Sequence, residues 1–448
     1  MTKLKVTFYG GVGFVTGANF LCETENVKFL VDCGLFQGSH EADMANHKSF
    51  PYSPATINFL FLTHAHMDHI GRIPKLVRDG FRGTIYSNPV TKSLAELMLA
   101  DAYAVMSYEV KQRGGELLYG EEDIRKAMSL WQTIEYHQKK VFADGIGVNS
   151  KDAGHILGST MYEFTRDGKK IVFTGDLGNS PTPLLPDTEV VSDANYLVME
   201  SVYGDRNHES KVERDKKFEQ VLRDTVIHNR TLVIPAFSLE RTQVILYEIN
   251  NLVEDKKVPA VPVFLDSPLA IKVTEIYERV SSHFNTAVRK EIALGDDIFN
   301  FPKLIKTARP NDSKEIVKVS NPKVIIAGSG MSTGGRVIHH EKHYLPDKNA
   351  TILLVGYQSL GTLGRQLQDR AKEVIIDGVR IRVEARIENI DGYSSHKDSD
   401  GLVSFVEDTE NTVQNVFVVM GEPKASLFLV QKLKDNLGVN AIYPEKGK

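Results

Sequence analysis

Three histidines and an aspartate occur within six residues of this chain, directly after an apolar run that ends at Leu62: His64, His66, Asp68 and His69. The run predicts a buried strand, and the residues from Ile70 to Asp79 predict a helix. His64 and His66 alternate along an extended backbone, so their side chains should point the same way. Asp68 and His69 follow at the turn into the helix, so this segment can offer ligand pairs to two neighbouring metal ions. Imidazole and carboxylate groups at this density match the ligand preferences of zinc better than those of a surface loop.

The length of 448 residues predicts two or three domains. A formal net charge of −4 and a pI of about 6.4 exclude a global basic surface for nucleic acid but leave room for a local basic cleft. The two cysteines, Cys22 and Cys33, lack zinc-finger spacing and favour a reducing compartment. Because no signal peptide or long apolar span is recognisable, we expect a cytoplasmic protein without a membrane segment.

The pattern of the chain changes twice. Up to about residue 208, short strands accompany helices expected over 88–110 and 121–132, and Trp131 is interpreted as a core residue of the second helix. From about 209 to 357, helices alternate with short apolar strands, which is typical of a parallel βαβ sheet. The final segment returns to strands, such as 380–387, and helices. Because no linker separates these segments, we expect the middle one to be inserted into the first domain.

Isolated residues of metal-ligand type follow three other apolar strands: Asp32, His155 and Asp176. A lone histidine is more often a core or surface residue. The repeated context, in which an apolar strand runs into a ligand type close to a glycine, favours a shared function instead. In a layered αβ fold such strand ends can converge on one edge.

The ordered set of these ligand types resembles the metallo-β-lactamase fold, and the middle segment resembles that of the β-CASP nucleases. Further blocks carry the resemblance: 200–204, 235–243, 266–270, 328–336, 356–365 and 393–398. The resemblance implies a four-layer αββα domain with an inserted α/β domain, in which helices flank a parallel sheet. The implied boundaries are 1–208 and 361–448 for the two parts of the metallo-β-lactamase domain and 209–360 for the β-CASP domain.

The resemblance also implies two zinc ions. One would be held by four residues: His64, His66, His155 and Asp176. The second would be held by three, with Asp176 as the bridge: Asp68, His69 and Asp176. A hydroxide shared by the metals would be the nucleophile, since two zinc ions lower the pKa of bound water and neutralise charge on the attacked phosphate.

Three further residues have implied roles around this centre. Asp32 would accept the second N–H of a ligand histidine and so fix its ring. His396 resembles the histidine that protonates the leaving oxygen in the family, and Glu200 would orient it. Asp68 is also expected to take part in catalysis.

The sequence departs from the family at Met420, where the active nucleases have a histidine that completes the second zinc site. A thioether suits copper(I) better than zinc. This departure leaves three outcomes: a second metal bound weakly with water in the gap, substitution by Glu422 or another nearby side chain, or an enzyme that works poorly or with another metal. We expect a weakened but occupied second site.

The glycine-rich segment 329–335 lies between an apolar strand and a helix, where backbone N–H groups can approach an anion. A dinucleotide fingerprint would need an acidic residue at the end of the next strand, and Leu353–Gly356 carries none. Contact with an RNA phosphate therefore fits better. The residues expected to make it are Ser238, Arg241, Ser329, Gly330, Ser332, Gly334, Arg336 and Arg365.

The favoured function is a zinc-dependent endoribonuclease that hydrolyses single-stranded RNA in the cleft between two domains. Single strands are favoured because a duplex would not easily enter such a cleft. One alternative is a hydrolase of a thioester, lactone or small phosphodiester. Another is an RNA-binding or scaffold protein whose catalysis is weakened through Met420. Besides RNA, a second copy of the chain or RNA-processing proteins are the expected partners.

Overall fold

The computed structural model describes residues 4–38, 40–359 and 361–448. Met1–Lys3, at the start of the first predicted domain, and Leu360, at the predicted end of the inserted one, lie outside these residues. The chain divides into two compact units, which are described separately here. The first unit comprises 1–207 and 395–448, and the second comprises 208–394. The expected insertion of one domain into another is therefore confirmed.

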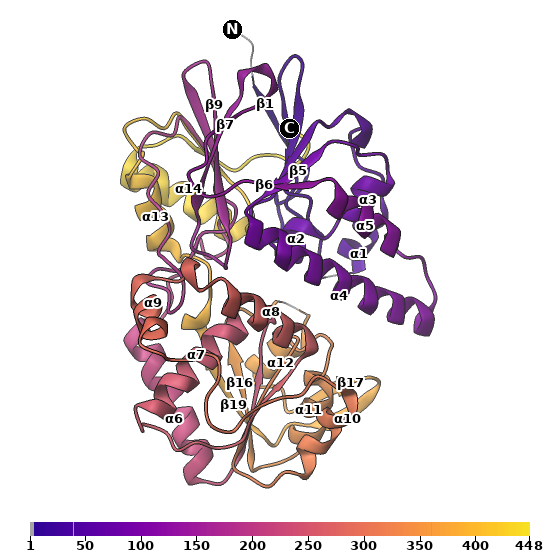
Figure 1. Ribbon diagram of the computed structural model, residues 1–448, viewed down its shortest axis with the longest axis vertical. Coiled ribbons are helices and arrows are strands. Elements are labelled where there is room, and N and C mark those ends of the chain that lie inside the picture. Colours follow the sequence, from indigo (N-terminus) through magenta and orange to yellow (C-terminus); the bar gives the residue numbers. More distant parts are fainter. Residues whose placement is uncertain (1–3, 39, 360) are drawn as a thin grey trace. The chain divides into compact units, whose positions relative to one another are not determined.

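The first unit contains a six-stranded sheet and a seven-stranded sheet, drawn in Figure 1. The first sheet follows the chain in the order β1 (Lys5–Phe8), β2 (Phe20–Glu23), β3 (Lys28–Val31), β4 (Phe59–Phe61), β5 (Thr84–Ser87) and β6 (Trp131–Thr133). The second has the order β21 (Ala441–Ile442), β20 (Asn415–Val418), β11 (Tyr196–Met199), β10 (Lys169–Phe173), β9 (Thr160–Arg166), β8 (Gly147–Asp152) and β7 (Lys140–Val141).

An aromatic-rich core lies between these two sheets. Phe29, Phe61 and Phe164 belong to it, and the Phe29 and Phe164 ring centroids are 4.8 Å apart. Helices cover both outer faces, as Figure 1 shows. On the first sheet these are α1 (His40–His47), α2 (Met67–Ile70), α3 (Ile73–Arg78), α4 (Pro89–Arg113) and α5 (Glu121–Ser129). On the second sheet they are α13 (Ser399–Glu407) and α14 (Pro423–Leu437). The expected αββα layering is thus confirmed.

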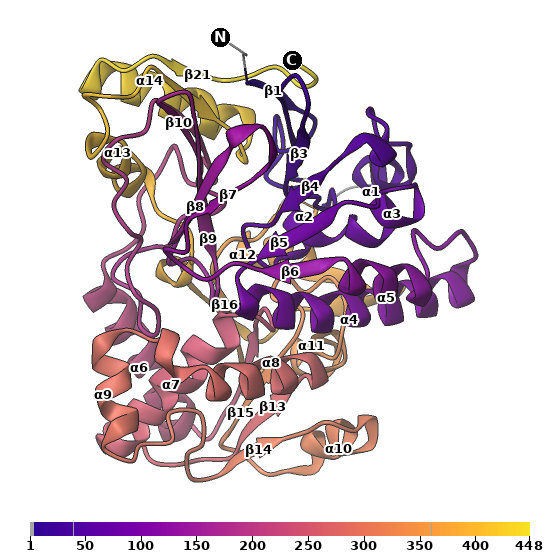
Figure 2. The same ribbon diagram turned by 45° about the horizontal axis from the view of Figure 1, so that its top comes forward.

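The second unit is built on a six-stranded parallel sheet. Its order is β14 (Leu304–Lys306), β13 (Val263–Asp266), β15 (Lys323–Ala327), β12 (Thr231–Pro235), β16 (Ala350–Val355) and β19 (Arg386–Ile390). Its helices are α6 (Lys211–Ile227), α7 (Arg241–Glu254), α8 (Pro268–Arg279), α9 (Thr286–Ala293), α10 (Pro310–Glu315), α11 (Val337–Tyr344) and α12 (Leu363–Gln368). Figure 2 shows α8 and α11 beside this sheet. A two-stranded hairpin, β17 (Glu373–Ile376) with β18 (Val379–Arg382), packs onto its core.

Two expectations need correction. The chain returns to the first unit at Ser395 and not at residue 361, because β19 pairs in parallel with β16 and buries Ile387 in the core of the second unit. Helix α5 ends at Ser129, and Trp131 instead begins strand β6. Trp131 is buried, and its indole N–H donates to Ser87 Oγ at 2.8 Å.

In the part of the chain that the structure describes, no helix is both long and apolar enough to cross a membrane.

Candidate metal centre

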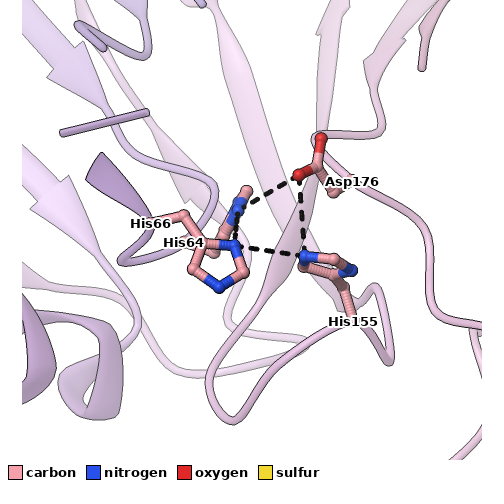
Figure 3. A group of neighbouring side chains, drawn as sticks. All are labelled: His64, His66, His155 and Asp176. Atoms are coloured by element: carbon pink, nitrogen blue, oxygen red, sulfur yellow. Dashed lines mark hydrogen bonds and ion pairs between the residues drawn. The ribbon is translucent and has the colours of Figure 1, made fainter. Parts of the chain in front are cut away.

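Four residues from distant parts of the first unit form one group of metal-ligand type (Figure 3): His64, His66, His155 and Asp176. One ligand atom from each lies within 4.8 Å of the others. Asp176 Oδ2 is 3.4 Å from His64 Nε2 and 3.6 Å from His155 Nε2. His66 Nδ1 lies 3.1 Å from His64 Nε2 and 3.3 Å from His155 Nε2. The structure therefore brings together all four residues expected at one metal.

A second group shares Asp176 and adds Asp68 and His69 from helix α2. His69 Nε2 lies 3.4 Å from Asp176 Oδ1 and 3.8 Å from Asp68 Oδ2. The two oxygens of Asp176 thus face different groups, which is the geometry of a bridging carboxylate. His69 Nε2 and Asp176 Oδ1 are buried and have no hydrogen-bond partner among the described residues. Buried polar atoms are normally paired, so this arrangement fits a bound cation.

Other buried groups orient the histidine rings. Asp32, at the end of β3, lies 2.8 Å from His69 Nδ1 and also accepts hydrogen bonds from the backbone N–H and hydroxyl of Thr63. The carbonyl of Ser395 lies 3.1 Å from His155 Nδ1. With Nδ1 protonated in both rings, each Nε2 lone pair faces the centre. Burial lowers the pKa of His64, His66 and His155, which keeps these rings in the neutral form that ligation requires.

His396 and Glu200 form a pair beside the first group, in which Glu200 is buried and His396 is partly exposed. His396 Nδ1 is 3.1 Å from both carboxylate oxygens of Glu200 and 4.0 Å from Asp176 Oδ2. Glu200 follows β11, and its Oε1 accepts a 2.6 Å hydrogen bond from the Leu177 N–H. Burial opposes protonation of His396, but the charge and hydrogen bond of Glu200 raise its pKa to about 9. A raised pKa favours the protonated ring, which can serve as a proton donor.

Met420 is buried in the core between the two sheets. Its backbone N–H donates to Gly11 O at 2.6 Å. The sulfur and the Phe20 ring both lie close to Gly11: a Cβ built on this glycine would be 2.5 Å from the Met420 sulfur and 3.2 Å from the Phe20 ring. The sulfur thus packs beside an aromatic ring, a favourable environment for a thioether. Among the described residues, Glu422 is exposed and belongs to none of the His/Asp/Glu groups.

Arg336, expected at an RNA phosphate, makes three hydrogen bonds within the second unit. Its Nη1 donates to Asp266 Oδ1 at 2.6 Å and to Thr307 O at 2.7 Å, and its Nη2 donates to Ala308 O at 2.8 Å. Asp266 is fully buried and also pairs with His340 Nε2 at 2.7 Å. These three bonds tie the guanidinium to the fold of the second unit, and its contact with an RNA phosphate stays a prediction.

We predict that Arg336→Ala lowers the free energy of unfolding by about 3 kcal/mol, because it leaves a buried carboxylate without its cation. Urea denaturation measures the loss. Arg365→Ala is the control, since Arg365 pairs at 2.9 Å with the exposed Asp369 and its removal should cost less than about 1 kcal/mol. Burial raises the pKa of Asp266, but its hydrogen-bond partners outweigh this effect and lower the pKa to about 2. The stabilisation by the Arg336–Asp266 pair should therefore fade as the pH falls from about 4 towards 2. Equal losses in the two variants would contradict this role.

The other residues expected at phosphate lie in the second unit, and their role stays a prediction. Ser238 Oγ is 3.3 Å from Ser267 Oγ, and the Arg241 guanidinium lies 5.9 Å from the Tyr393 ring. Ser329 Oγ accepts from the Thr333 N–H at 2.9 Å, and Ser332 Oγ donates to the buried Glu341 at 2.5 Å. The space beside the two glycines differs. A Cβ built on Gly334 would have no atom within 4 Å, whereas a Cβ built on Gly330 would lie 2.7 Å from the Phe237 ring.

Comparison with known proteins decides the family. Residues 21–201 match a metallo-β-lactamase superfamily domain, and residues 242–367 match the β-CASP domain. Residues 380–444 match a Zn-dependent metallo-hydrolase RNA specificity domain. Ribonuclease TTHA0252 of Thermus thermophilus is 33% identical over 95% of both chains. The chain belongs to the β-CASP ribonuclease family of the metallo-β-lactamase superfamily.

More distant relatives agree with this assignment. The transcription termination factor FttA of Methanosarcina mazei is 30% identical to this β-CASP protein over 97% of the chain and 70% of its own length. That of Pyrococcus horikoshii is 28% identical over 98% of the chain and 70% of its own length. A crystal structure of a protein of unknown function from Enterococcus faecalis shares the fold, with a TM-score of 0.58, 13% identity and coverage of 100% and 99% of the two chains.

Sequence reasoning missed two groups at the centre of this β-CASP protein. Thr63 fixes Asp32 through its backbone N–H and its hydroxyl, and the Ser395 carbonyl fixes His155. The position of Thr63, directly before His64, was the only available signal for the first. A backbone carbonyl can come from any residue type, so the second had no signal in the sequence.

Proposed function

We propose that the chain is a zinc-dependent endoribonuclease that hydrolyses phosphodiester bonds of single-stranded RNA. The observation that carries this proposal is the position of Asp176, whose two oxygens face two separate groups of ligand type. A bridging carboxylate between two such groups is what a two-metal phosphodiesterase needs. The family's RNA specificity domain and its ribonuclease relative support RNA as the substrate.

The protein's own residues would divide the work between binding and proton transfer. The two groups around Asp176 would hold metal ions, which, when bound, activate water and stabilise the charge of the attacked phosphate. Asp32 and the Ser395 carbonyl would keep His69 and His155 aimed at the centre. His396, protonated through its pairing with Glu200, would donate its proton to the departing oxygen.

A substrate panel tests this function. Labelled single-stranded RNA, the same RNA in a duplex, and a set of thioesters and lactones are offered to the zinc-loaded protein. We expect internal cleavage of the single strand, slower cleavage of the duplex and no turnover of the small substrates. Thioester or lactone hydrolysis without RNA cleavage would identify another metallo-hydrolase, and RNA binding without cleavage would identify a scaffold protein. Either result would overturn the proposal.

We predict that the second zinc ion is held more weakly than the first, because its described group has three members where the first has four. After extensive dialysis the unmodified protein should keep about one zinc ion per chain. Met420→His should increase the zinc retained. The backbone at Met420, with φ of 51°, is in a region where histidine is more common than most residues. Met420→Leu is the matched control and should leave retention unchanged. Two equally tight zinc ions in the unmodified protein would contradict the prediction.

A further inference from the structure

A cluster of aromatic rings and cations lies on the first unit, outside the residues that form the candidate metal centre. We call it the aromatic–basic patch: Phe14, Phe36, Lys48, Phe50, Arg72 and Lys446. The Arg72 guanidinium lies 4.6 Å from the Phe36 ring centroid and 5.3 Å from that of Phe50. Lys446 Nζ lies 4.9 Å from the Phe36 centroid and 6.0 Å from that of Phe14. Residues from both ends of the chain thus build one surface feature.

The cations of the patch have no carboxylate partner among the described residues. In the ranges that the structure describes, Lys48, Arg72 and Lys446 make no ion pair with a carboxylate. Arg72 is only 6% exposed, and the one hydrogen bond that it donates to a described residue runs from Nε to the Gly34 carbonyl. Burial and the charges of Arg72 and Lys48 lower the pKa of Lys446. Two cations at one aromatic ring, Arg72 and Lys446 at Phe36, favour an anionic ligand in a chain with a net charge of −4.

Phe14 is the exposed aromatic side chain of the patch. Its side chain is 52% exposed, although Phe36 meets it in a T-shaped contact at 6.3 Å. Packing of the fold explains Phe36, which is buried, and the stacking of Arg72 between Phe36 and Phe50. It does not explain a phenyl ring that remains half in solvent beside a lysine. An exposed aromatic face next to unpaired cations is instead typical of surfaces that bind single-stranded nucleic acid.

Backbone hydrogen bonds connect the patch to helix α2, which carries Asp68 and His69. The Ala18 N–H donates to Asp68 O and the Leu35 N–H donates to Met67 O, both at 2.9 Å. These bonds fix the loop that contains Phe14 and the position of Phe36. The chain end that carries Lys446 is held by reciprocal backbone bonds between Phe8 and residues 447 and 448. The patch therefore lies next to the segment that supplies two candidate ligands of the second metal.

We propose that the aromatic–basic patch binds a nucleotide of the RNA substrate that flanks the attacked bond. The base stacks on Phe14, and Lys446 binds the adjoining phosphate, while the buried Arg72 adds its positive charge beneath them. This subsite rests on the proposed function, since it takes the same RNA that the metal centre would cut. Stacking is tolerant of sequence because every base has a π-face, so the subsite contributes affinity and register without selecting a particular base.

Binding of a fluorescent single-stranded RNA to the full-length, zinc-loaded protein tests the subsite. All proteins carry His396→Ala so that the RNA persists during the measurement. We expect Phe14→Ala to weaken binding about tenfold, since loss of one stacked base typically costs between about 5- and 150-fold. Lys446→Ala should lower the slope of log Kd against log salt by about 0.7, the value for one phosphate of a single strand.

The controls are Phe428→Ala and Lys434→Ala on helix α14. Phe428 is 50% exposed, and Lys434 is likewise exposed and makes no ion pair among the described residues. Both variants should bind RNA like the parent protein. In a set of RNAs that each lack one base, Phe14→Ala should lose its effect with one member only, because that RNA has no base to stack.

The outcomes separate the subsite from the function. If the protein with His396 intact neither binds nor cuts RNA, the proposed function fails and the subsite fails with it. If that protein cuts RNA but Phe14→Ala binds as well as Phe428→Ala, the subsite alone is overturned. A loss of affinity in Phe14→Ala that is the same for every RNA of the abasic set would also overturn it, because it would indicate a general effect on folding and not stacking.

Discussion

Asp176→Asn should reduce the rate of RNA cleavage by on the order of 10,000-fold, because residues that act as one catalytic unit fail together. Among the described residues, Asp176 belongs to each of the three groups of ligand-type residues. An amide keeps the size of the carboxylate but loses the negative charge, and its nitrogen has no lone pair to offer to a metal. The substitution should therefore remove ligands from both metal positions at once. Single-turnover cleavage of labelled RNA and the zinc content of the purified variant measure the two effects.

Asp193→Asn is the matched control for this prediction. Asp193 lies in the same unit, its side chain is 62% exposed, and it pairs with Lys170 at 2.6 Å. It should retain parental zinc content and cleavage. If Asp176→Asn kept more than about a tenth of the parental rate, the bridging role of Asp176 would be wrong.

His396→Ala should lower kcat by about 100- to 10,000-fold, the usual contribution of a general acid. Zinc content and RNA affinity should stay close to those of the parent, because His396 is expected to act on the departing oxygen and not to hold a metal. Glu200→Gln should have a smaller effect of the same kind. It keeps an acceptor for the His396 N–H but removes the charge that raises the pKa of His396 to about 9.

His137→Ala serves as the control, since His137 also pairs with a carboxylate, Glu189, but its side chain is 63% exposed. It should cut RNA like the parent protein. The assignment of His396 as proton donor would be refuted by a His396→Ala variant with parental kcat. A His396→Ala variant whose activity fell only in proportion to a loss of zinc would also refute this assignment, because His396 would then be a metal ligand.

The metal centre was largely predictable because its residues carry strong local signals. Four residues of ligand type lie within six positions, and His155 and Asp176 each follow a glycine beyond the end of a strand. The order of these motifs identified the family, and the family supplied the expected roles of His396 and Asp32. The contact of Asp32 with His69 joins residues 37 positions apart, which no sequence pattern alone reveals.

What could not be predicted depends on long-range contacts. An arginine beside a glycine-rich loop is compatible with a phosphate or a carboxylate, and only the fold shows that Asp266, 70 positions away, holds Arg336. The end of the inserted unit was missed because β19 is a short strand whose pairing with β16 has no local signal. The aromatic–basic patch was not recognised because its members are scattered from Phe14 to Lys446.

Zinc-dependent cleavage by the unmodified protein tests the central claim most directly. The protein is stripped of metal with a chelator, and zinc is returned in steps while the cleavage of a labelled single-stranded RNA is followed. Asp176→Asn is purified in parallel to exclude a contaminating nuclease. The account predicts no cleavage by the stripped protein and internal cleavage that returns with added zinc. Undiminished cleavage by the stripped protein, or no cleavage at any zinc concentration, would contradict it.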